Sequence, residues 1–290
     1  MLNRRLVKSP NIIPTAMSQR TVFFISDQTG VTAETLGHSL LTQFEGVKFR
    51  QVTLPFLSNR DKAEEAVAKI NLTAQLEGVR PIIFSTLVDD DLRVMFQRSN
   101  GLYLDFFDAF LAPLEKELEQ RSSHTAGRAH GMSDLQKYNQ RIDATNYALA
   151  SDDGGHNRDY DRADLILVGV SRSGKTPTCL YMALQYGIYA ANYPLADDDF
   201  ERGDLPPVLK LHMPKLYGLT IAADRLQQIR KERRPNGRYS TIQQVRFELR
   251  EAEKLFRRSG IPYIDTTKTS IEEIASTILD KTAVERRVRP

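Results

Sequence analysis

The chain has 290 residues and a net charge of +3; 41% of its residues are hydrophobic and 27% are charged. This length and composition allow one large domain or two ordinary ones, and they exclude a globally disordered chain. The single cysteine, Cys179, excludes an intrachain disulfide and a zinc site built on several thiolates. No stretch approaches the ~20 apolar residues that a membrane helix needs. We therefore expect a cytoplasmic protein that has no membrane partner.

The first 20 residues are basic but lack the apolar core of a secretory signal. We expect a flexible tail here, with a short organelle-targeting peptide as the alternative. Strands and helices then alternate, which is typical of parallel βαβ units and predicts an N-terminal α/β domain over residues 21–120. The predicted strands are 21–26, 49–54 and 81–86, and the predicted helices are 31–44, 60–76 and 90–119, the last one broken near Asn100-Gly101.

The alternation fails over residues 121–160, where the sequence is polar and rich in Ser, His, Gly and Asp. One helix is predicted around residues 134–149, inside an otherwise irregular central segment. Long segments of this kind are usually functional lids or linkers. The alternation resumes over residues 161–290, which we expect to form a second domain. Its predicted strands are 163–170, 188–193, 216–221 and 261–266, and its predicted helices are 177–186, 222–233, 240–258 and 270–281.

The strongest signal in the sequence is Gly169-Val170-Ser171-Arg172-Ser173-Gly174-Lys175-Thr176, which matches the phosphate-loop pattern G-x-x-x-x-G-K-[ST] in full. A strand enters the loop and a helix leaves it, so backbone N–H groups and the helix dipole would face an anion. Lys175 would contact the outer phosphates, Arg172 would add a second charge, and the Thr176 hydroxyl would hold Mg²⁺. The alternative is an ordinary turn containing glycine. The pattern favours an α/β fold with two βαβ regions and mainly parallel sheets, the second region being a P-loop kinase-like module.

A kinase also needs a group near the acceptor hydroxyl, often an aspartate. Asp152 and Asp153 in the irregular segment are the first candidates, together with Lys175 of the loop. Asp197–Asp199 follow a predicted strand end, where ligands gather in open α/β sheets. His130 is a further candidate for a catalytic role. Each of these side chains outside the loop is also compatible with a solvated or structural position.

Two other segments could bind anions. Ser26-Asp27-Gln28-Thr29-Gly30 lies between a strand and a helix, and it could form a second anion site or simply a capped helix start. Arg230, Arg233 and Arg234 belong to a strongly basic segment. They could cover phosphates or dock an acidic partner, and an exposed basic helix is the plainer interpretation.

The extended string GVSRSGKTPTCLYMA at 169–183 closely resembles the phosphoenolpyruvate synthase regulatory protein family. The resemblance continues in order from about residue 20 to about residue 285. Gly174 favours this branch, because the related branch that regulates pyruvate, phosphate dikinase usually has Ser there. The other matching segments are FFISDQTGVTAETLGHSLLTQF after the N-terminal tail, VTLPF at 52–56, AHG at 129–131, YNQRIDATNYALASDDG at 138–154, ANYPL at 191–195, LYGLTI at 216–221 and IRKERR at 229–234.

The resemblance implies an ADP-dependent phosphorylation of a threonine on phosphoenolpyruvate synthase, which inactivates that enzyme. It also implies the phosphate-dependent removal of that phosphoryl group, which releases pyrophosphate. The expected ligands are then ADP, inorganic phosphate and Mg²⁺, and the expected partner is the synthase rather than a nucleic acid; a homodimer stays open. The alternatives are a small-molecule nucleotide kinase and a non-catalytic nucleotide-sensing module.

Overall fold

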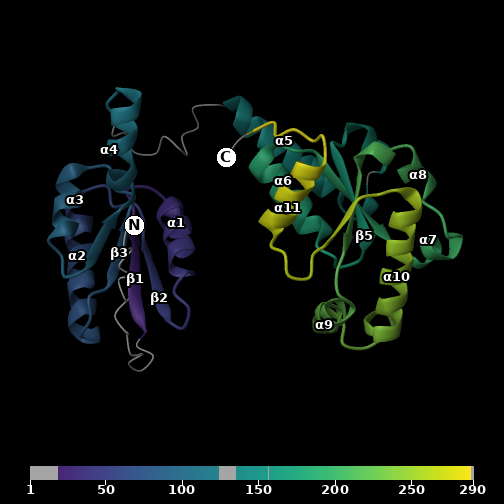
Figure 1. Cartoon of the computed structure of the whole chain (residues 1–290), viewed down its shortest axis with the longest axis horizontal. Coiled ribbons are helices and arrows are strands. Elements are labelled where there is room, and N and C mark those ends of the chain that lie inside the picture. The colour runs from purple at the N-terminus through teal and green to yellow at the C-terminus, as the bar shows by residue number, and fades with distance from the viewer. Residues whose placement is uncertain (1–18, 124–134, 156, 289–290) are drawn as a thin grey trace, which may run out of the picture. The chain divides into compact units, whose positions relative to one another are not determined.

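The structure is a computed structural model that describes residues 19–123, 135–155 and 157–288. The chain divides into two compact units, Met1–Gly131 and Met132–Pro290, and each is described by itself (Figure 1). Each unit contains one four-stranded sheet in which every strand pair is parallel. The predicted α/β fold with two βαβ regions is confirmed.

In the first unit the strand order is β2-β1-β3-β4. Its central strand β1 is buried on both faces: Val22 and Phe24 pack with residues of α1, and Phe23 and Ile25 pack with residues of α2 and α3. The strands are β1 (Arg20–Ile25), β2 (Phe49–Leu54), β3 (Ile82–Ser85) and β4 (Leu102–Asp105), and the helices are α1 (Val31–Leu41), α2 (Arg60–Glu77), α3 (Asp90–Gln97) and α4 (Phe106–Leu118).

The fourth strand of this unit corrects the sequence interpretation. We expected one helical stretch over residues 90–119 with a break near Asn100-Gly101, and the structure instead inserts β4 between α3 and α4. Leu102 pairs with Ile82 and Asp105 pairs with Ser85 at the edge of the sheet. A four-residue strand is too short to show a two-residue period against the flanking helical pattern, so only the tertiary pairing reveals it.

In the second unit the strand order is β6-β5-β7-β8. The last helix begins with a capping box, since Ser270 and Glu273 bond each other's backbone N–H. The strands are β5 (Leu165–Val170), β6 (Ala190–Leu195), β7 (Leu216–Thr220) and β8 (Tyr263–Asp265). The helices are α5 (Leu135–Ala150), η1 (Asp152–Gly154), η2 (Asn157–Arg162), α6 (Lys175–Tyr186), α7 (Asp197–Arg202), α8 (Pro207–Lys210), η3 (Met213–Lys215), α9 (Ala223–Arg233), η4 (Arg238–Ser240), α10 (Ile242–Ser259) and α11 (Ile271–Lys281).

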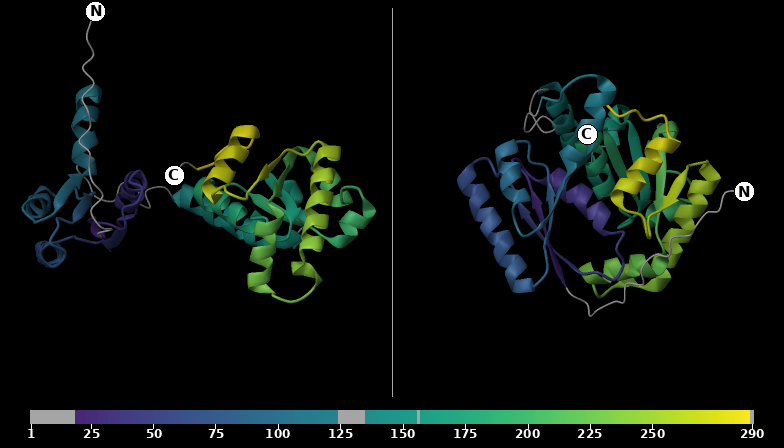
Figure 2. Two further views of the ribbon diagram at one scale, coloured as in Figure 1. Left: turned by 60° about the horizontal axis from the view of Figure 1, so that its bottom comes forward. Right: turned by 60° about the vertical axis from the view of Figure 1, so that its left-hand side comes forward.

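The central strand β5 is covered by helices on both faces, with α6 and α11 on one side and α10 on the other (Figures 1 and 2). Leu165 and Leu167 pack toward α6 and α11, whereas Ile166, Val168 and Val170 pack toward α10. The chain continues from β5 to one neighbour, β6, and then returns to the other, β7. This reversal creates a switch point at the carboxyl end of β5, where open α/β sheets bind their ligands.

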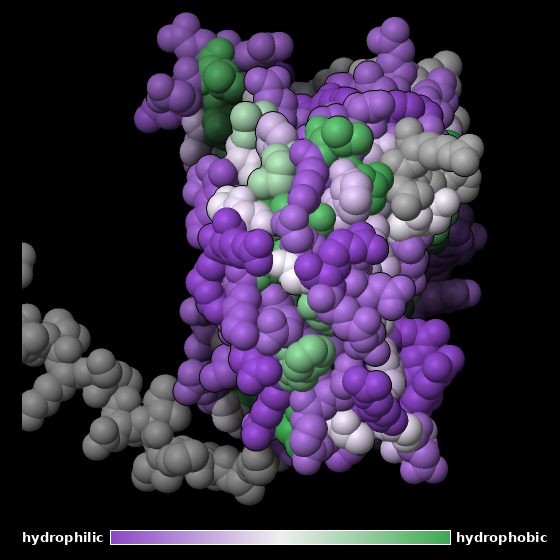
Figure 3. Space-filling model, turned by 90° about the vertical axis from the view of Figure 1, so that its right-hand side faces the viewer, coloured by the Kyte–Doolittle hydropathy of each residue, from purple (hydrophilic) through white to green (hydrophobic). Residues whose placement is uncertain are grey.

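The face of the second unit around α7 and α8 is mainly hydrophilic, with hydrophobic residues scattered across it (Figure 3). Single exposed apolar residues are normal on a solvated surface. No helix in the described part of the chain is long and apolar enough to cross a membrane.

Candidate phosphate-binding site

The loop between β5 and α6 has the curled backbone that the sequence pattern predicts. Arg172 has φ 76° and Gly174 has φ 96°, so two left-handed residues flank Ser173. Such alternation favours a loop in which successive N–H groups turn toward one side and form an anion-binding concavity. In this structure the N–H of Ser173 donates to the Val170 carbonyl oxygen at 3.3 Å within the loop. Gly169 lets β5 and β7 approach, because a Cβ at this position would lie 2.5 Å from the Leu219 carbonyl oxygen.

The N-terminus of α6 is open to an anion. Its N-cap residue is Gly174, and no side chain of the described residues caps the first turn. A Cβ built on Gly174 would meet no described atom within 4 Å, so the space beside this residue is open. Unpaired N–H groups and the positive end of a helix dipole are what a phosphate group binds. The geometry therefore fits the phosphates of a nucleotide.

Lys175 lies inside the loop and is only 4% exposed. Its ammonium group donates a hydrogen bond to the Val170 carbonyl oxygen at 2.9 Å. Burial lowers the pKa of Lys175 to about 8, while Asp153 and Asp152 oppose that shift by attraction. Phosphate oxygens close to the ammonium group would favour its charged form in the same way. A bound anion would therefore offset part of the cost of keeping the buried ammonium group of Lys175 charged.

Asp152 lies beside the loop, although it comes from the irregular segment before β5. Its Oδ1 accepts a 2.7 Å hydrogen bond from the Thr176 hydroxyl and a 2.6 Å bond from the Asn192 amide. The Oδ1 of Asn192 in turn accepts the backbone N–H of Asp153 at 3.1 Å, which fixes the short helix η1 against β6. The structure therefore places Asp152 next to Thr176 of the loop, as is required if the two side chains hold the same metal ion.

Thr176 and Asp152 offer oxygen ligands of the kind that Mg²⁺ prefers. Mg²⁺ usually takes one or two protein oxygens and completes its shell with phosphates and water. The described residues contain no group of three or more His, Cys, Asp or Glu that would form an all-protein metal cage. The residues at the loop fit a nucleotide-bound Mg²⁺.

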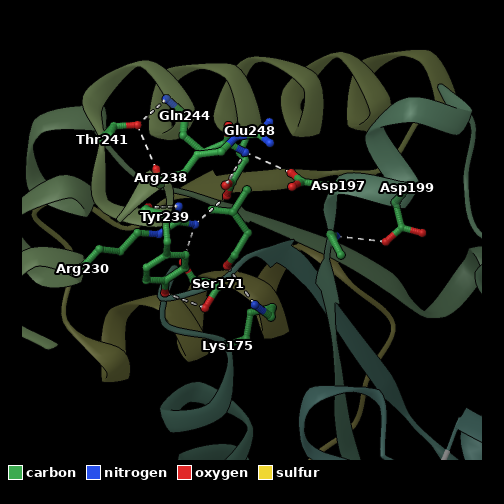
Figure 4. Close-up of polar contacts among 12 residues, drawn as sticks. Ser171, Lys175, Asp197, Asp199, Arg230, Arg238, Tyr239, Thr241, Gln244 and Glu248 are labelled. Atoms are coloured by element: carbon green, nitrogen blue, oxygen red, sulfur yellow. Dashed lines mark hydrogen bonds and ion pairs between the residues drawn. The ribbon is translucent and has the colours of Figure 1, made fainter. Parts of the chain in front are cut away.

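A buried arginine connects the loop to α9 and α10 (Figure 4). Arg230 is fully buried, and its Nη2 donates to the Ser171 carbonyl oxygen at 3.2 Å and to the Glu248 carboxylate at 2.6 Å. Its Nη1 donates to the Tyr239 carbonyl oxygen at 3.1 Å, and its guanidinium stacks on the Tyr239 ring. The hydroxyl groups of Tyr239 and Ser171 are 3.0 Å apart.

Arg230 therefore differs from the exposed basic helix that was the plainer expectation. Its neighbours Arg233 and Arg234, by contrast, are exposed at the end of α9. Arg230 lies four residues after the buried Leu226, on the same face of the helix. Tertiary packing therefore buries Arg230, whereas Arg233 and Arg234 stay exposed to solvent.

Other predicted site residues are used elsewhere. Asp199 is buried and accepts the backbone N–H of Ala196, and Asp197 accepts a hydrogen bond from Gln244 (Figure 4). Asp199 thus contacts the start of α7 and Asp197 contacts α10, rather than the phosphate loop. His130 lies outside the described residues.

The predicted second anion site lies at the start of α1. Gly30 has φ 82° and is the N-cap of α1, and within the described part of the chain no side chain caps this helix. Ser26 accepts the N–H of Gln28, and Asp27 accepts the N–H of Val88, so both side chains stabilise the loops after β1 and β3. Burial raises the pKa of Asp27. An anion site at this turn stays a prediction.

Sequence reasoning missed three residues that shape the site: Asn192, Tyr239 and Glu248. A signal existed for Asn192, because an amide within the buried strand Ala190–Leu195 needs a hydrogen-bond partner. Glu248 lies among the buried residues of the amphipathic helix α10. No local pattern marks Tyr239, whose partners are 68 and 9 residues away.

Comparison with known proteins gives one family match. The profile described as kinase/pyrophosphorylase matches residues 22–279. Among similar proteins, one from Alkalilimnicola ehrlichii is 55% identical over 93% of this chain and 98% of its own length. One from Pseudomonas putida is 56% identical over 93% of this chain and all of its own length, and one from Stutzerimonas stutzeri is 55% identical with the same coverage. Each carries the name "Putative phosphoenolpyruvate synthase regulatory protein".

Proposed function

The chain belongs to the kinase/pyrophosphorylase family, and from this premise we propose that it regulates phosphoenolpyruvate synthase by two opposing phosphoryl transfers. One transfer uses ADP to phosphorylate a threonine of the synthase and inactivates it in the cytoplasm. The other uses inorganic phosphate to remove that group and releases pyrophosphate. The observation that carries the proposal is the curled loop at the switch point of the second sheet, with Lys175 inside it.

The two proposed reactions place similar demands on the loop. In the first, the threonine hydroxyl loses its proton to solvent as its oxygen attacks the β-phosphorus of ADP, the bond to the bridging oxygen breaks, and AMP leaves. In the second, a phosphate oxygen attacks the phosphothreonine phosphorus, and the threonine oxygen leaves and takes a proton. ADP and pyrophosphate share a diphosphate, so one set of loop N–H groups with Lys175 can bind both. We therefore propose one shared site.

The residues beside the loop have distinct proposed roles. The loop N–H groups and Lys175 bind and orient the phosphates, and Arg172 lies exposed at the loop where it can add charge. Thr176 and Asp152 would hold Mg²⁺, which neutralises phosphate charge during transfer. Asn192 orients Asp152 through the 2.6 Å hydrogen bond.

The direct test mixes the protein with phosphoenolpyruvate synthase and ADP and maps phosphothreonine by mass spectrometry. The expected result is one modified threonine, loss of synthase activity and formation of AMP. Adding phosphate to the modified synthase should restore its activity and release pyrophosphate. Transfer to free nucleotides without the synthase would instead indicate a small-molecule kinase. ADP binding without transfer to any acceptor would indicate a sensing module.

We expect Asp152→Asn to lower both transfer rates by about 100-fold, since it removes a negative charge next to Thr176 while keeping the side-chain shape. ADP affinity measured without Mg²⁺ should change little, whereas its enhancement by Mg²⁺ should shrink. Asp198→Asn is the matched control, because Asp198 is exposed on α7. Equal Mg²⁺ enhancement in the Asp152 variant and the wild type would contradict the assigned role.

A further inference from the structure

We propose that Arg230 is a positioning residue that holds the phosphate loop in its anion-binding shape, with Glu248 and Tyr239 as its supports. The inference deepens the proposed function, because it rests on that loop binding a nucleotide. Arg230 comes from α9, Glu248 from α10 and Tyr239 from η4, so three elements outside the loop converge on it. Figure 4 shows the arginine between Tyr239 and Glu248, directly above Ser171.

Arg230 and Tyr239, together called the anchor, contact both the backbone and the side chain of one loop residue, Ser171. Arg230 binds the main-chain oxygen of Ser171 at 3.2 Å, and the Tyr239 hydroxyl lies 3.0 Å from the Ser171 side-chain oxygen. Arg230 also donates to the Tyr239 carbonyl oxygen, and its guanidinium lies 4.3 Å from the centre of the Tyr239 ring, so the two residues of the anchor contact each other. Ser171 is therefore held through its backbone and its side chain at once.

Holding the Ser171 carbonyl also sets the direction of the next N–H group. The C=O and N–H of a trans peptide lie in one plane and point in opposite directions within it. A carbonyl drawn toward Arg230 therefore turns the N–H of Arg172 away from Arg230. Arg172 has φ 76°, a conformation that a non-glycine residue adopts only where its surroundings impose it. The anchor supplies that constraint on the loop.

Stability alone does not explain this arrangement. A buried ion pair is often no more stabilising than two apolar side chains of similar volume. The Nε of Arg230 is buried and has no hydrogen-bond partner among the described residues, which adds a desolvation penalty. An arginine provides several donors in one rigid fork, and here these reach Ser171, Tyr239 and Glu248 together. An apolar pair could not hold the Ser171 carbonyl.

The test separates positioning from folding with the double variant Arg230→Met/Glu248→Met. It removes both buried charges together, so we expect its thermal unfolding midpoint to be equal to or above that of the wild type. ADP affinity measured by calorimetry should fall at least 10-fold. Amide hydrogens of residues 171–176 should exchange faster than in the wild type without any ligand.

The matched control is Asp224→Asn/Arg246→Gln. This ion pair also joins α9 and α10, but it is exposed and contacts neither Ser171 nor Tyr239. We expect wild-type ADP affinity and wild-type exchange in the loop. Two milder variants support the test if the double variant fails to fold. Arg230→Lys and Tyr239→Phe each remove part of the anchor, and each should weaken ADP binding 3-fold or more while leaving the unfolding midpoint within a few degrees.

The proposal is overturned if a folded Met/Met variant binds ADP as the wild type does and shows unchanged exchange in the loop. If the double variant does not fold, wild-type ADP affinity in both milder variants overturns it as well. Failure of the wild type to bind ADP would count against the proposed function instead. In that case the exchange comparison would still decide whether Arg230 holds the loop.

Discussion

Replacing Lys175 by methionine is expected to abolish both phosphoryl transfers and, at the same time, to make the protein more stable. We expect both rates to fall at least ~100-fold, because a buried charge next to the phosphates is lost. Burial lowers the pKa of Lys175 from 10.5 to about 8, so keeping its ammonium group charged at pH 7 costs about 3 kcal/mol. The free energy of unfolding of the variant should thus rise by about 2–3 kcal/mol, after loss of the Val170 hydrogen bond.

The gain in stability should depend on pH in a defined direction. Between pH 8 and 10.5 the unfolded lysine is still protonated while the folded one is not. The unfolded state then binds more protons, so wild-type stability from this group rises with pH. The advantage of Lys175→Met is therefore full below about pH 8 and disappears by about pH 10.5. Urea unfolding of both proteins at several pH values measures the difference.

Two further variants separate the effects of Lys175. Lys254→Met removes an exposed lysine of α10 and should change neither the transfer rates nor the unfolding free energy by more than ~0.5 kcal/mol. Lys175→Ala should lose both activities as well, with a smaller gain in stability because it leaves a cavity. If either Lys175 variant lost only the ADP-dependent reaction, one site would not serve both transfers.

Gly169→Ala is expected to destabilise the second unit by about 3 kcal/mol or more, and to abolish ADP binding in whatever fraction stays folded. The added Cβ would lie 2.5 Å from the Leu219 carbonyl oxygen and 3.0 Å from the Ser173 hydroxyl. This carbonyl oxygen belongs to the backbone of the neighbouring strand β7, so β5 and β7 must move apart to make room for the Cβ. Urea unfolding and ADP calorimetry measure the two effects.

Gly174→Ser is the matched control within the same loop. A Cβ at this position meets no atom of the described residues within 4 Å, so the positive φ of 96° is the main obstacle to the substitution. The expected cost is about 1–2 kcal/mol, the penalty for a left-handed L-residue. ADP binding should persist, because the substitution keeps Lys175 and the backbone N–H groups of the loop. Equal destabilisation by the two substitutions would show that crowding against β7 is not the cause.

The sequence determined most strands, the longer helices and the position of the curled loop, because these depend on local chemistry. Alternating strands and helices gave the two parallel sheets, and the G-x-x-x-x-G-K-[ST] spacing located the loop between β5 and α6. Local patterns failed where an element was too short or where burial changed a residue's role. The edge strand Leu102–Asp105 was missed, and Arg230 was grouped with exposed arginines.

Only the tertiary structure decided which distant side chains surround that loop. Asp152 meets Thr176 from 24 residues away, Asn192 meets Asp152 from 40, and Arg230 meets Ser171 from 59. The sequence by itself could name Asp152 and Arg230 as candidates, but it could not tell a site residue from a solvated one. That distinction depends on burial and hydrogen-bond partners, which arise when the strands of the sheet are placed side by side.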